Sequence, residues 1–476
     1  MGDSIERRVT RAGRACALAA LLIAASLLSC AARQSAGAPS PPASGADSPK
    51  ATALGADAPE AAGRGAPATA ALYVSTRGDD SKDGSSPERA LKSISAALAR
   101  ARAGTTVFVA AGTYYEQVVT KAGGAEGAEI TVKSSDGTAV IDGSRLDWAA
   151  GRNQNQGLVE LRHPYVKLSG LKVVGSKNTG ILLDADNLTV EGCEVSEARL
   201  HGISTDTSRQ TNYRGRRGTM IRDVVLRGNT VARAALSGSG QSVSLIADGF
   251  VVAGNTVRDG PKEGIDIWLG AKHGEVTGNT VYGNKAPGIY VDGAAYVRIH
   301  RNVVYGNRSG IGVSSENEDY ETHDVWVYNN VIYDNADAGL FLWDKRSRPG
   351  RRGVQAVLMA HNTLAGNRHS FFLSGEGNTG EIVNNLGQSA SESVRDESAR
   401  SSVAAHDNVW LPAPNGFAAA ARKDFRLTAG SPAVDRGVRL PPLKDDRGQT
   451  FPMDSDFDGA PRTRGRAPDA GAYEYR

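Results

Sequence analysis

A short template built around asparagine recurs through the middle of the chain. In YVRIHRNVVYGN, apolar residues precede Asn302 by five and three positions (Val297, Ile299) and follow it by two (Val304). Further copies are centred on Leu171, Cys193, Asn229, Asn255, Asn279, Asn330, Asn362 and, more weakly, Asn385. Successive copies lie 22 to 36 residues apart on a base period of 22–24 residues. A period of this length with occasional insertions is typical of a solenoid.

The apolar residues of each copy alternate with polar ones, which indicates β-strands rather than helices. VRIHRNVV is followed after a turn by GIGV, and the preceding copy is followed by GIYV. The 56 glycines supply the turns that bound such short strands. Two or three strands per repeat predict a parallel β-helix whose coils stack about 4.8 Å apart. Aliphatic side chains then fill the interior, and each asparagine hydrogen-bonds to the asparagines above and below it. Cys193 is predicted to be a buried substitute in this ladder.

The residues before the repeats predict a cover for the open end of the solenoid. In ERALKSISAALARARA, residues 88–103, Leu91, Ile94 and Leu98 lie on one helical face. A helix there would cover strand edges that are otherwise exposed.

With YVSTRGDDSKDGSSP before it and GTTVFVAAGTYYEQV after it, this run resembles the N-terminal cap of secreted bacterial right-handed parallel β-helix proteins of the pectate-lyase-like superfamily. Together with the repeats, the resemblance spans residues 70–411. It implies an all-β fold over residues 71–411, a right-handed parallel β-helix (solenoid) with an N-terminal capping helix. Residues 412–476, including KDFRLTAGSPAVDRG, resemble a C-terminal segment that closes such proteins. The superfamily holds lyases, hydrolases, epimerases and adhesins, so the fold alone does not define the chemistry.

Residues 1–29 are predicted to be a lipoprotein signal peptide. A start with four arginines leads into the apolar ACALAALLIAASLLS, which is short for a membrane span. The following LLSC resembles a bacterial lipoprotein box in which Cys30 is lipidated; an ordinary secretory signal with an incidental cysteine is the alternative. Residues 30–70 are mostly Ala, Gly, Ser and Pro, which predicts a flexible tether. We therefore expect a secreted protein, anchored by lipid to a bacterial outer membrane or cell surface.

The charge balance argues against a nucleic-acid partner. The formal net charge is +3, and it becomes +1 (51 basic against 50 acidic residues) when residues 1–29 are excluded. No basic run is interleaved with aromatic residues, as nucleic-acid binding would require. Of the three cysteines, Cys193 alone would remain unmodified in the mature chain, so no disulfide framework is expected. We expect a monomer that contacts a membrane only through its anchor.

Strands that begin Gly-Ile predict which side chains face outward. Because the isoleucine points inward, the residues two and four positions after the glycine point out. This rule places the following residues outside: Ser204, Asp206, Asp266, Trp268, Tyr290, Asp292, Gly312, Ser314, Phe341 and Trp343, with Glu316 just beyond. The coils are neighbours, so these residues should form one patch rich in carboxylates and aromatic rings.

Such a patch suits a polysaccharide, because aromatic faces stack on sugar rings and carboxylates bind hydroxyl groups or cations. The candidate substrate-binding residues are Trp268, Tyr290, Glu316, Trp343 and Arg346. On a uronate polymer, β-elimination needs a cation to neutralise the substrate carboxylate and a base to remove the C5 proton. The candidate ligands for Ca²⁺ are Glu263, Asp266 and Asp292, and the candidate bases are Lys262 and Lys345. KEGIDIW resembles the acidic calcium motif of one pectate-lyase family, but has Lys262 in place of its first aspartate.

Two alternatives remain open. Asp266 and Asp292 are predicted to be diagonal neighbours, roughly 7–8 Å apart, which also fits the two catalytic carboxylates of an inverting glycoside hydrolase. The paired-Asp and His-Gly motifs of polygalacturonases and the Asp-Pro-His-Asp motif of alginate epimerases are absent from the sequence. A non-catalytic glycan-binding or adhesion solenoid, with merely solvated exterior residues, is the other alternative. Our leading prediction is a surface-anchored polysaccharide lyase that acts on an acidic polysaccharide by calcium-assisted β-elimination.

Overall fold

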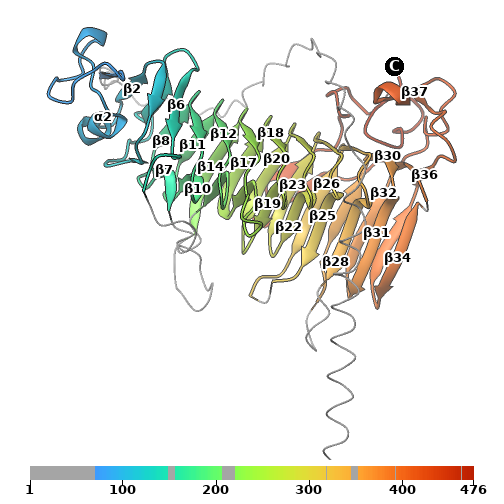
Figure 1. Cartoon of the computed structure of the whole chain (residues 1–476). Coiled ribbons are helices and arrows are strands. Elements are labelled where there is room, and N and C mark those ends of the chain that lie inside the picture. Colours follow the sequence, from blue (N-terminus) through green and yellow to red (C-terminus); the bar gives the residue numbers. More distant parts are fainter. Residues whose placement is uncertain are drawn as a thin grey trace, which may run out of the picture. The chain divides into compact units, whose positions relative to one another are not determined.

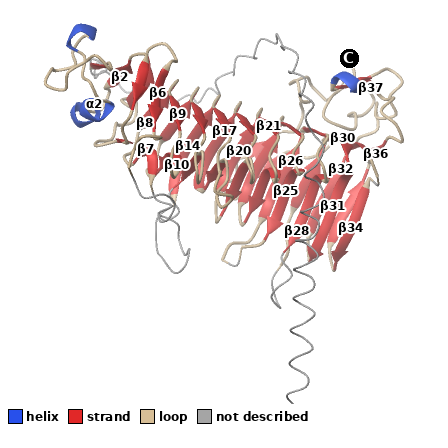
Figure 2. Cartoon of the chain, viewed as in Figure 1, coloured by secondary structure: helices blue, strands red, loops and turns tan. Residues whose placement is uncertain are grey.

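The structure is a computed structural model that describes residues 70–147, 156–205, 220–317, 319–344, 352–391, 393–462 and 464–476. These residues belong to one compact unit, Ala66–Arg476. In the described part of the chain, three long parallel sheets contain 13, 12 and 11 strands, and strands of successive coils lie side by side in each (Figure 1). We call them sheets A, B and C. Figure 2 shows that strands dominate these residues, so the all-β prediction is confirmed.

The strands of the three sheets have the following bounds. Sheet A contains β1 (Ala71–Val74), β2 (Thr106–Val109), β5 (Ile130–Ser134), β8 (Val166–Ser169), β11 (Leu188–Glu191), β14 (Ile221–Arg227), β17 (Ala247–Ala253), β20 (Lys272–Thr277), β23 (Ala295–His300), β26 (His323–Tyr328), β29 (Val357–Ala360), β32 (Thr379–Val383) and β35 (Ser402–His406). Sheet B contains β3 (Gly112–Tyr114), β6 (Ala139–Asp142), β9 (Lys172–Val174), β12 (Glu194–Ser196), β15 (Thr230–Ala232), β18 (Thr256–Arg258), β21 (Thr280–Tyr282), β24 (Val303–Tyr305), β27 (Val331–Tyr333), β30 (Thr363–Asn367), β33 (Leu386–Ser389) and β36 (Val409–Trp410). Sheet C contains β4 (Val118–Val119), β7 (Gly157–Leu161), β10 (Thr179–Leu183), β13 (Ile203–Thr205), β16 (Val243–Leu245), β19 (Ile265–Trp268), β22 (Pro287–Asp292), β25 (Ser309–Ser315), β28 (Ala338–Asp344), β31 (His369–Glu376) and β34 (Val394–Ala399).

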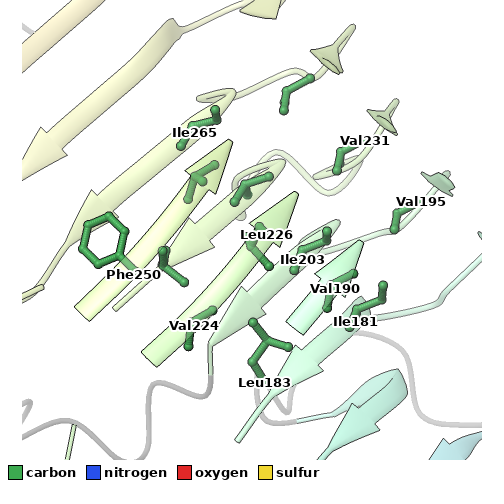
Figure 3. Packing of buried hydrophobic residues seen from close by; sticks show 14 of the residues in the cluster. Ile181, Leu183, Val190, Val195, Ile203, Val224, Leu226, Val231, Phe250 and Ile265 are labelled. Carbon is green, nitrogen blue, oxygen red and sulfur yellow. The ribbon is translucent and has the colours of Figure 1, made fainter. Parts of the chain in front are cut away.

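Each coil runs through sheets A, B and C in turn, which makes the body a parallel β-helix. The coil with β20, β21 and β22 stacks on the coil with β23, β24 and β25. Equivalent residues pair directly, as Val276 does with Ile299 and Ile289 with Ile311. These side chains are buried in the core. Figure 3 shows the same kind of apolar row in other coils, with Ile181, Ile203 and Ile265 labelled. Each fully buried aliphatic side chain stabilises the fold by about 2 kcal/mol, so the period-two alternation of the sequence is what closes the coil.

An asparagine ladder joins the coils at the turn between sheets A and B, as the repeat predicted. The Asn279 side-chain NH₂ group donates to Asn302 Oδ1 (2.9 Å) and to the Val252 carbonyl (2.8 Å), and the Asn279 backbone N–H also donates to Asn302 Oδ1 (2.9 Å). Cys193 is buried in the same row, and its backbone N–H donates to Asn229 Oδ1 (2.9 Å). The structure therefore confirms Cys193 as a ladder substitute.

A second asparagine ladder, which the repeat template did not include, lies at the turn between sheets B and C. It consists of Asn284, Asn307, Asn335 and Asn367. Its members come from the Gly-Asn and Asp-Asn pairs that follow the short strands of sheet B.

Two residues in neighbouring coils compensate for each other's size inside the β-helix. Gly274 takes a position that is apolar in most repeats, and a Cβ atom there would lie 1.8 Å from Cζ of Phe250. Phe250 occupies the paired position of the preceding strand and is labelled in Figure 3. The large ring thus fills the space that the glycine leaves, which keeps the interior closely packed.

The N-terminal end is closed by a helix shorter than predicted. Helix α2 spans Ile94–Arg100, and the Ser93 side chain accepts a hydrogen bond from the Ala96 backbone N–H at its start. A separate 3₁₀-helix, η1, spans Pro87–Arg89. Between them, Leu91 forms a bridge with Val74 of β1, and this pairing keeps residues 90–93 out of the helix. Leu91, Ile94 and Leu98 are buried in the core, so the predicted cover is present.

The closing segment, residues 412–476, packs against the outer faces of sheets A and B. It contains β37 (Phe417–Ala419), η4 (Ala420–Arg422), β38 (Asp424–Leu427), β39 (Leu443–Lys444) and β40 (Thr450–Phe451). Phe417, Phe425 and Leu427 pack with residues of sheet B such as Leu386. On sheet A, Leu443 and Met453 pack with Trp326 and Tyr328.

Polar contacts also hold the closing segment to sheet A. His273 of β20 lies between Asp248 (Nδ1 to Oδ1, 2.6 Å) and Asp446 of the closing segment (Nε2 to Oδ1, 2.7 Å). The buried Arg462 guanidinium donates to Glu474 Oε1 (2.8 Å) and to Asn329 Oδ1 (2.7 Å). Among the described residues, the two apolar clusters of the closing segment contain no residue of sheet C.

The predicted signal peptide, Cys30 and nearly all of the predicted tether lie outside the described residues, so these remain predictions. Within the described residues, no helix is long and apolar enough to cross a membrane.

Candidate functional site

The outer face of sheet C brings the predicted side chains together. In β19, Ile265 and Ile267 are fully buried in the core, so Asp266 and Trp268 take the outward positions between and after them. Asp266 pairs with Tyr290 of β22, and Trp268 pairs with Asp292. The expected juxtaposition on one exterior wall is therefore confirmed, because alternation and register act together. The chemical roles of these residues remain predictions.

Four carboxylates gather at this place, and we call Glu263, Asp266, Asp292 and Glu316 the carboxylate cluster. Asp266 is its most buried member, with 4% of its surface exposed. Among the described residues, no hydrogen-bond partner reaches its Oδ1 atom. Burial raises the pKa of Asp266 well above the ordinary value of 3.8, and the charges of Glu263 and Asp292 raise it further. Glu316 acts in the same direction, whereas Lys262 opposes the shift.

Asp292 has a positional role that sequence patterns did not indicate. Its Oδ1 atom accepts hydrogen bonds from the backbone N–H groups of Glu316 (2.7 Å) and Asn317 (3.1 Å). The neighbouring Gly293 backbone N–H donates to Thr322 Oγ1 (2.7 Å). Together these bonds fasten the connection between β25 and β26 to the edge of sheet C. One oxygen of Asp292 is thus committed to the backbone, which limits its availability as a cation ligand or catalytic group.

Tyr290 is held by the residue that Asp292 positions. Its hydroxyl group donates a hydrogen bond to Glu316 Oε1. Burial and the adjacent Glu316 charge raise the pKa of Tyr290, so its phenol stays neutral at physiological pH. The Tyr290 ring also stacks with that of Phe341, with centroids 6.0 Å apart.

The two predicted tryptophans lie on the same outward row. Trp268 is half-buried, and its indole N–H donates to Ser244 Oγ (3.0 Å), so its ring leans back over β16. Trp343 is half-buried in β28 and pairs with Ser314 of β25.

The candidate bases differ in what the structure shows. Lys262 has 40% of its side chain exposed, and its Nζ atom lies 3.9 Å from Glu263 Oε1. Lys262 is therefore beside the carboxylate cluster. Lys345, Arg346 and the outward residue Asp206 lie outside the described residues.

The carboxylate cluster offers oxygen atoms of the kind that bind a hard cation such as Ca²⁺. Among the described residues, no group of three or more His, Cys, Asp or Glu side chains is arranged as a metal site. Two buried carboxylate oxygens without hydrogen-bond partners, Glu263 Oε2 and Asp266 Oδ1, nevertheless belong to the cluster. Unpartnered carboxylate oxygens are the ligands that Ca²⁺ prefers. The chemistry of these two residues fits a cation, and the role of Asp292 as a third ligand remains a prediction.

Sequence reasoning placed Phe341 in the outward patch without giving it a role, and it did not include Ser244. Both residues lie in the same outward row of sheet C as Tyr290. Ser244 was missed because its strand does not begin with Gly-Ile. Their contacts with Tyr290 and Trp268 cross coil boundaries, and only the register of the coils reveals them.

The structure defines a parallel β-helix protein with a polar and aromatic outer face on sheet C. Residues 72–223 match the family described as Pel9A-like, right handed beta helix region, and residues 222–386 match the family described as Right handed beta helix region. The chain belongs to the family of right-handed β-helix proteins that resemble pectate lyases.

The chain is also similar to individual known proteins. The chain is 30% identical over 329 residues to the uncharacterized protein YwoF of Bacillus subtilis (strain 168). The aligned region covers 62% of the chain and 68% of YwoF. The crystal structure of pectate lyase Pel9A is similar with a TM-score of 0.53 at 18% identity, covering 85% of the chain and 96% of Pel9A. The periplasmic alginate epimerase AlgG gives a TM-score of 0.44 at 14% identity, covering 65% and 78% of the two chains. At these identities the structural likeness concerns the fold.

Proposed function

We propose that the protein binds an acidic polysaccharide on the outer face of sheet C and cleaves it by cation-assisted β-elimination. The observation that carries this proposal is the buried Asp266 carboxyl group. Among the described residues, one of its oxygens has no hydrogen-bond partner, and the group lies among three other carboxylates. An unsatisfied buried carboxyl group is costly to stability, and such groups in a native fold call for a functional explanation.

The electrostatics of the carboxylate cluster support a requirement for a cation. A uronate carboxylate that approached four acidic side chains would be repelled. Glu263 and Asp266 would hold a divalent cation through their unpartnered oxygens, with Asp292 as a weaker contributor. When bound, the cation would neutralise the substrate carboxylate and so make the C5 proton more acidic.

The residues beside the cluster would remove the C5 proton and bind the sugar rings. Lys262 is the described candidate for the base that removes the C5 proton, because it lies next to Glu263 and is solvent-accessible. Elimination then breaks the C4–O4 bond and leaves a C4–C5 double bond, and the departing O4 takes a proton from water to become a hydroxyl group. Trp268, Tyr290 and Trp343 offer ring surfaces for the sugars, and Glu316 holds Tyr290 in place. Lys345 and Arg346 keep their proposed roles as second base and substrate contact.

The activity is tested by the ultraviolet absorbance of the unsaturated uronate product. The purified protein would be incubated with polygalacturonate, alginate and glycosaminoglycans, with added Ca²⁺ or with a chelator. We expect absorbance to rise on at least one polymer and to be lost with the chelator. No rise on any of these polymers would reject the lyase activity.

One observation favours a second candidate function, glycoside hydrolysis. The raised pKa of Asp266 would keep this carboxyl group protonated near its diagonal neighbour Asp292. A protonated acid beside an ionised carboxylate is the arrangement that glycosidases use. Reducing sugar released without a double bond, and without a need for Ca²⁺, would identify this reaction. Polymer binding without any product would leave the role of a glycan-binding or adhesion solenoid.

We also propose that the mature protein is a monomer held at the bacterial surface by lipid on Cys30. Fatty-acid labelling of cells that express the full chain would test the anchor. We expect the wild type to be labelled and to sediment with membranes, and the Cys30→Ser variant to lose both properties. Equal labelling of the two proteins would contradict the proposal.

A further inference from the structure

Strand β25 makes a gap in the row of large side chains on sheet C. Its outward positions hold Gly312 and Ser314, whereas β22 on one side contributes Tyr290 and β28 on the other contributes Phe341 and Trp343. The small residues therefore form a low strip between two rows of aromatic and acidic side chains.

Phe341 bends into this gap. A Cβ atom added to Gly312 would lie 2.0 Å from Cζ of Phe341 and 2.5 Å from both Cε atoms. The ring of Phe341 therefore occupies the space directly above the glycine. There it meets the ring of Tyr290 across the strand, with centroids 6.0 Å apart and planes inclined by 27°. Both side chains are partly exposed. We call Tyr290 and Phe341 the aromatic pair.

The aromatic rings of sheet B provide a contrast. Tyr282, Tyr305 and Tyr333 stack face to face with centroids 4.9 and 4.8 Å apart. This stack ends against Phe425 of the closing segment, 5.2 Å from Tyr333. Its rings therefore cover one another, and the closing segment covers the last one. The described contacts of the closing segment are with sheets A and B, whereas the aromatic pair lies on sheet C.

The aromatic pair is continuous with the carboxylate cluster. Tyr290 pairs directly with Asp266, and its hydroxyl group is bonded to Glu316. Phe341 lies three strands from Asp266 in the same outward row, which is about 14 Å at the usual strand spacing. A sugar that rests on Phe341 is thus not the sugar whose bond is broken at Asp266.

We propose that the aromatic pair is a subsite that binds the apolar face of one pyranose ring of the acidic polysaccharide. The polymer then runs across the strands of sheet C, from the carboxylate cluster toward Phe341. Aromatic rings supply a large contact area at a low cost in conformational entropy, which suits them to sugar faces. Gly312 is the specificity-determining position, because any side chain there would displace Phe341. This inference rests on the proposed function, since it assigns a neighbouring subsite to the same substrate.

The test compares binding of variants by affinity electrophoresis in gels that contain polygalacturonate or alginate, with dextran gels as the neutral control. The variants are Phe341→Ala, which removes the ring, and Gly312→Ala, which keeps the ring but forces it to move. Tyr305→Ala is the matched control, because it removes a stacked ring from sheet B. A cooperative thermal unfolding transition, measured for each variant, would show that the variant is folded.

We expect Phe341→Ala and Gly312→Ala each to weaken retention about five-fold or more in an acidic gel that retains the wild type. Phe341→Leu, which keeps apolar volume without a ring face, should weaken it similarly. Tyr305→Ala should be retained like the wild type, even where its melting temperature falls. For a polymer that is cleaved, Phe341→Ala should raise KM for long chains more than it lowers kcat, because the ring binds a remote sugar.

The possible failures are distinguishable. Wild-type retention of both Phe341→Ala and Gly312→Ala would overturn the subsite, whatever the reaction is. Retention that depends on Phe341 without any unsaturated product would uphold the subsite and reject the lyase activity. An equal loss in Tyr305→Ala would show a general effect of stability and overturn the inference. Failure of both acidic gels to retain the wild type would overturn both proposals.

Discussion

Two sets of buried polar side chains in this β-helix differ in how completely their hydrogen-bonding groups are satisfied. In the asparagine ladder at the turn between sheets A and B, Asn302 is fully buried and its side chain makes five hydrogen bonds. In the carboxylate cluster on sheet C, Asp266 is almost as buried, yet its Oδ1 atom has no hydrogen-bond partner among the described residues. Both sets arise from the same stacking of coils.

This difference suits the asparagines to holding the fold together and the carboxylates to the function that we propose. A satisfied polar network rigidifies a fold, whereas an unsatisfied buried carboxyl group weakens it. The asparagines therefore hold the coils in register. Asp266 is retained at a cost to stability, and our proposal explains this cost by a role in binding a cation or transferring a proton.

The largest expected effect comes from breaking the ladder. Asn302→Ala would leave the Asn279 backbone N–H and side-chain NH₂ group without their shared acceptor, and it would remove the amide donor to the Val276 and His300 carbonyl groups. We expect the free energy of unfolding to fall by about 4 kcal/mol in urea denaturation. Thr280→Ala, on the half-buried outer face of β21, should change it by less than about 0.5 kcal/mol. A loss below about 1 kcal/mol for Asn302→Ala would contradict the role of the ladder.

A smaller loss of stability is expected from changing Gly274, whose missing side chain makes room for Phe250 of the preceding strand. Gly274→Ala would place a methyl group 1.8 Å from the Phe250 ring, which should lower the free energy of unfolding by about 2 kcal/mol. The double variant Phe250→Val with Gly274→Val restores valine at both positions, as in neighbouring repeats. It should recover to within about 1 kcal/mol of the wild type. Additive losses in the double variant would show that the two residues do not compensate each other.

The smallest effect is a pH dependence from the carboxylate cluster. The pKa of Asp266 is higher in the folded than in the unfolded protein, so folding is favoured below about pH 4 and becomes less favoured as pH rises toward the folded pKa. Asp266→Asn removes this penalty. With a chelator present, the advantage of the variant in free energy of unfolding should grow steadily as the pH rises from about 4 to about 8. A difference that stays constant or shrinks over this range would show that Asp266 is not perturbed as described.

The sequence allowed the architecture and the facing of side chains to be predicted, because both depend on local periodicity. Alternation around Ile265 and Ile267 placed Asp266 outside, and the repeat length placed Tyr290 beside it. The commitment of Asp292 to the backbone of Glu316 and Asn317 was not predictable. It depends on how the connection after β25 folds back onto sheet C, and no periodic pattern encodes that path.

The other omissions share a physical cause. Phe341 fills the space above Gly312, as Phe250 fills that beside Gly274. In each pair a large residue and a glycine lie on neighbouring strands, more than 20 residues apart in the chain. Such compensation becomes visible only when the register of the coils is known. The faces that the closing segment covers were likewise hidden, because its contacts with sheets A and B depend on tertiary structure.

The most direct test of the account is the Asp266→Asn variant, assayed side by side with the wild type for unsaturated uronate product and for free energy of unfolding. We predict that product formation falls about a hundred-fold or more, while stability at neutral pH stays equal or increases because a neutral amide replaces a buried carboxyl group. Equal rates of product formation in the two proteins, together with a loss of stability like that of Asn302→Ala, would show that Asp266 is a structural residue and would contradict the account.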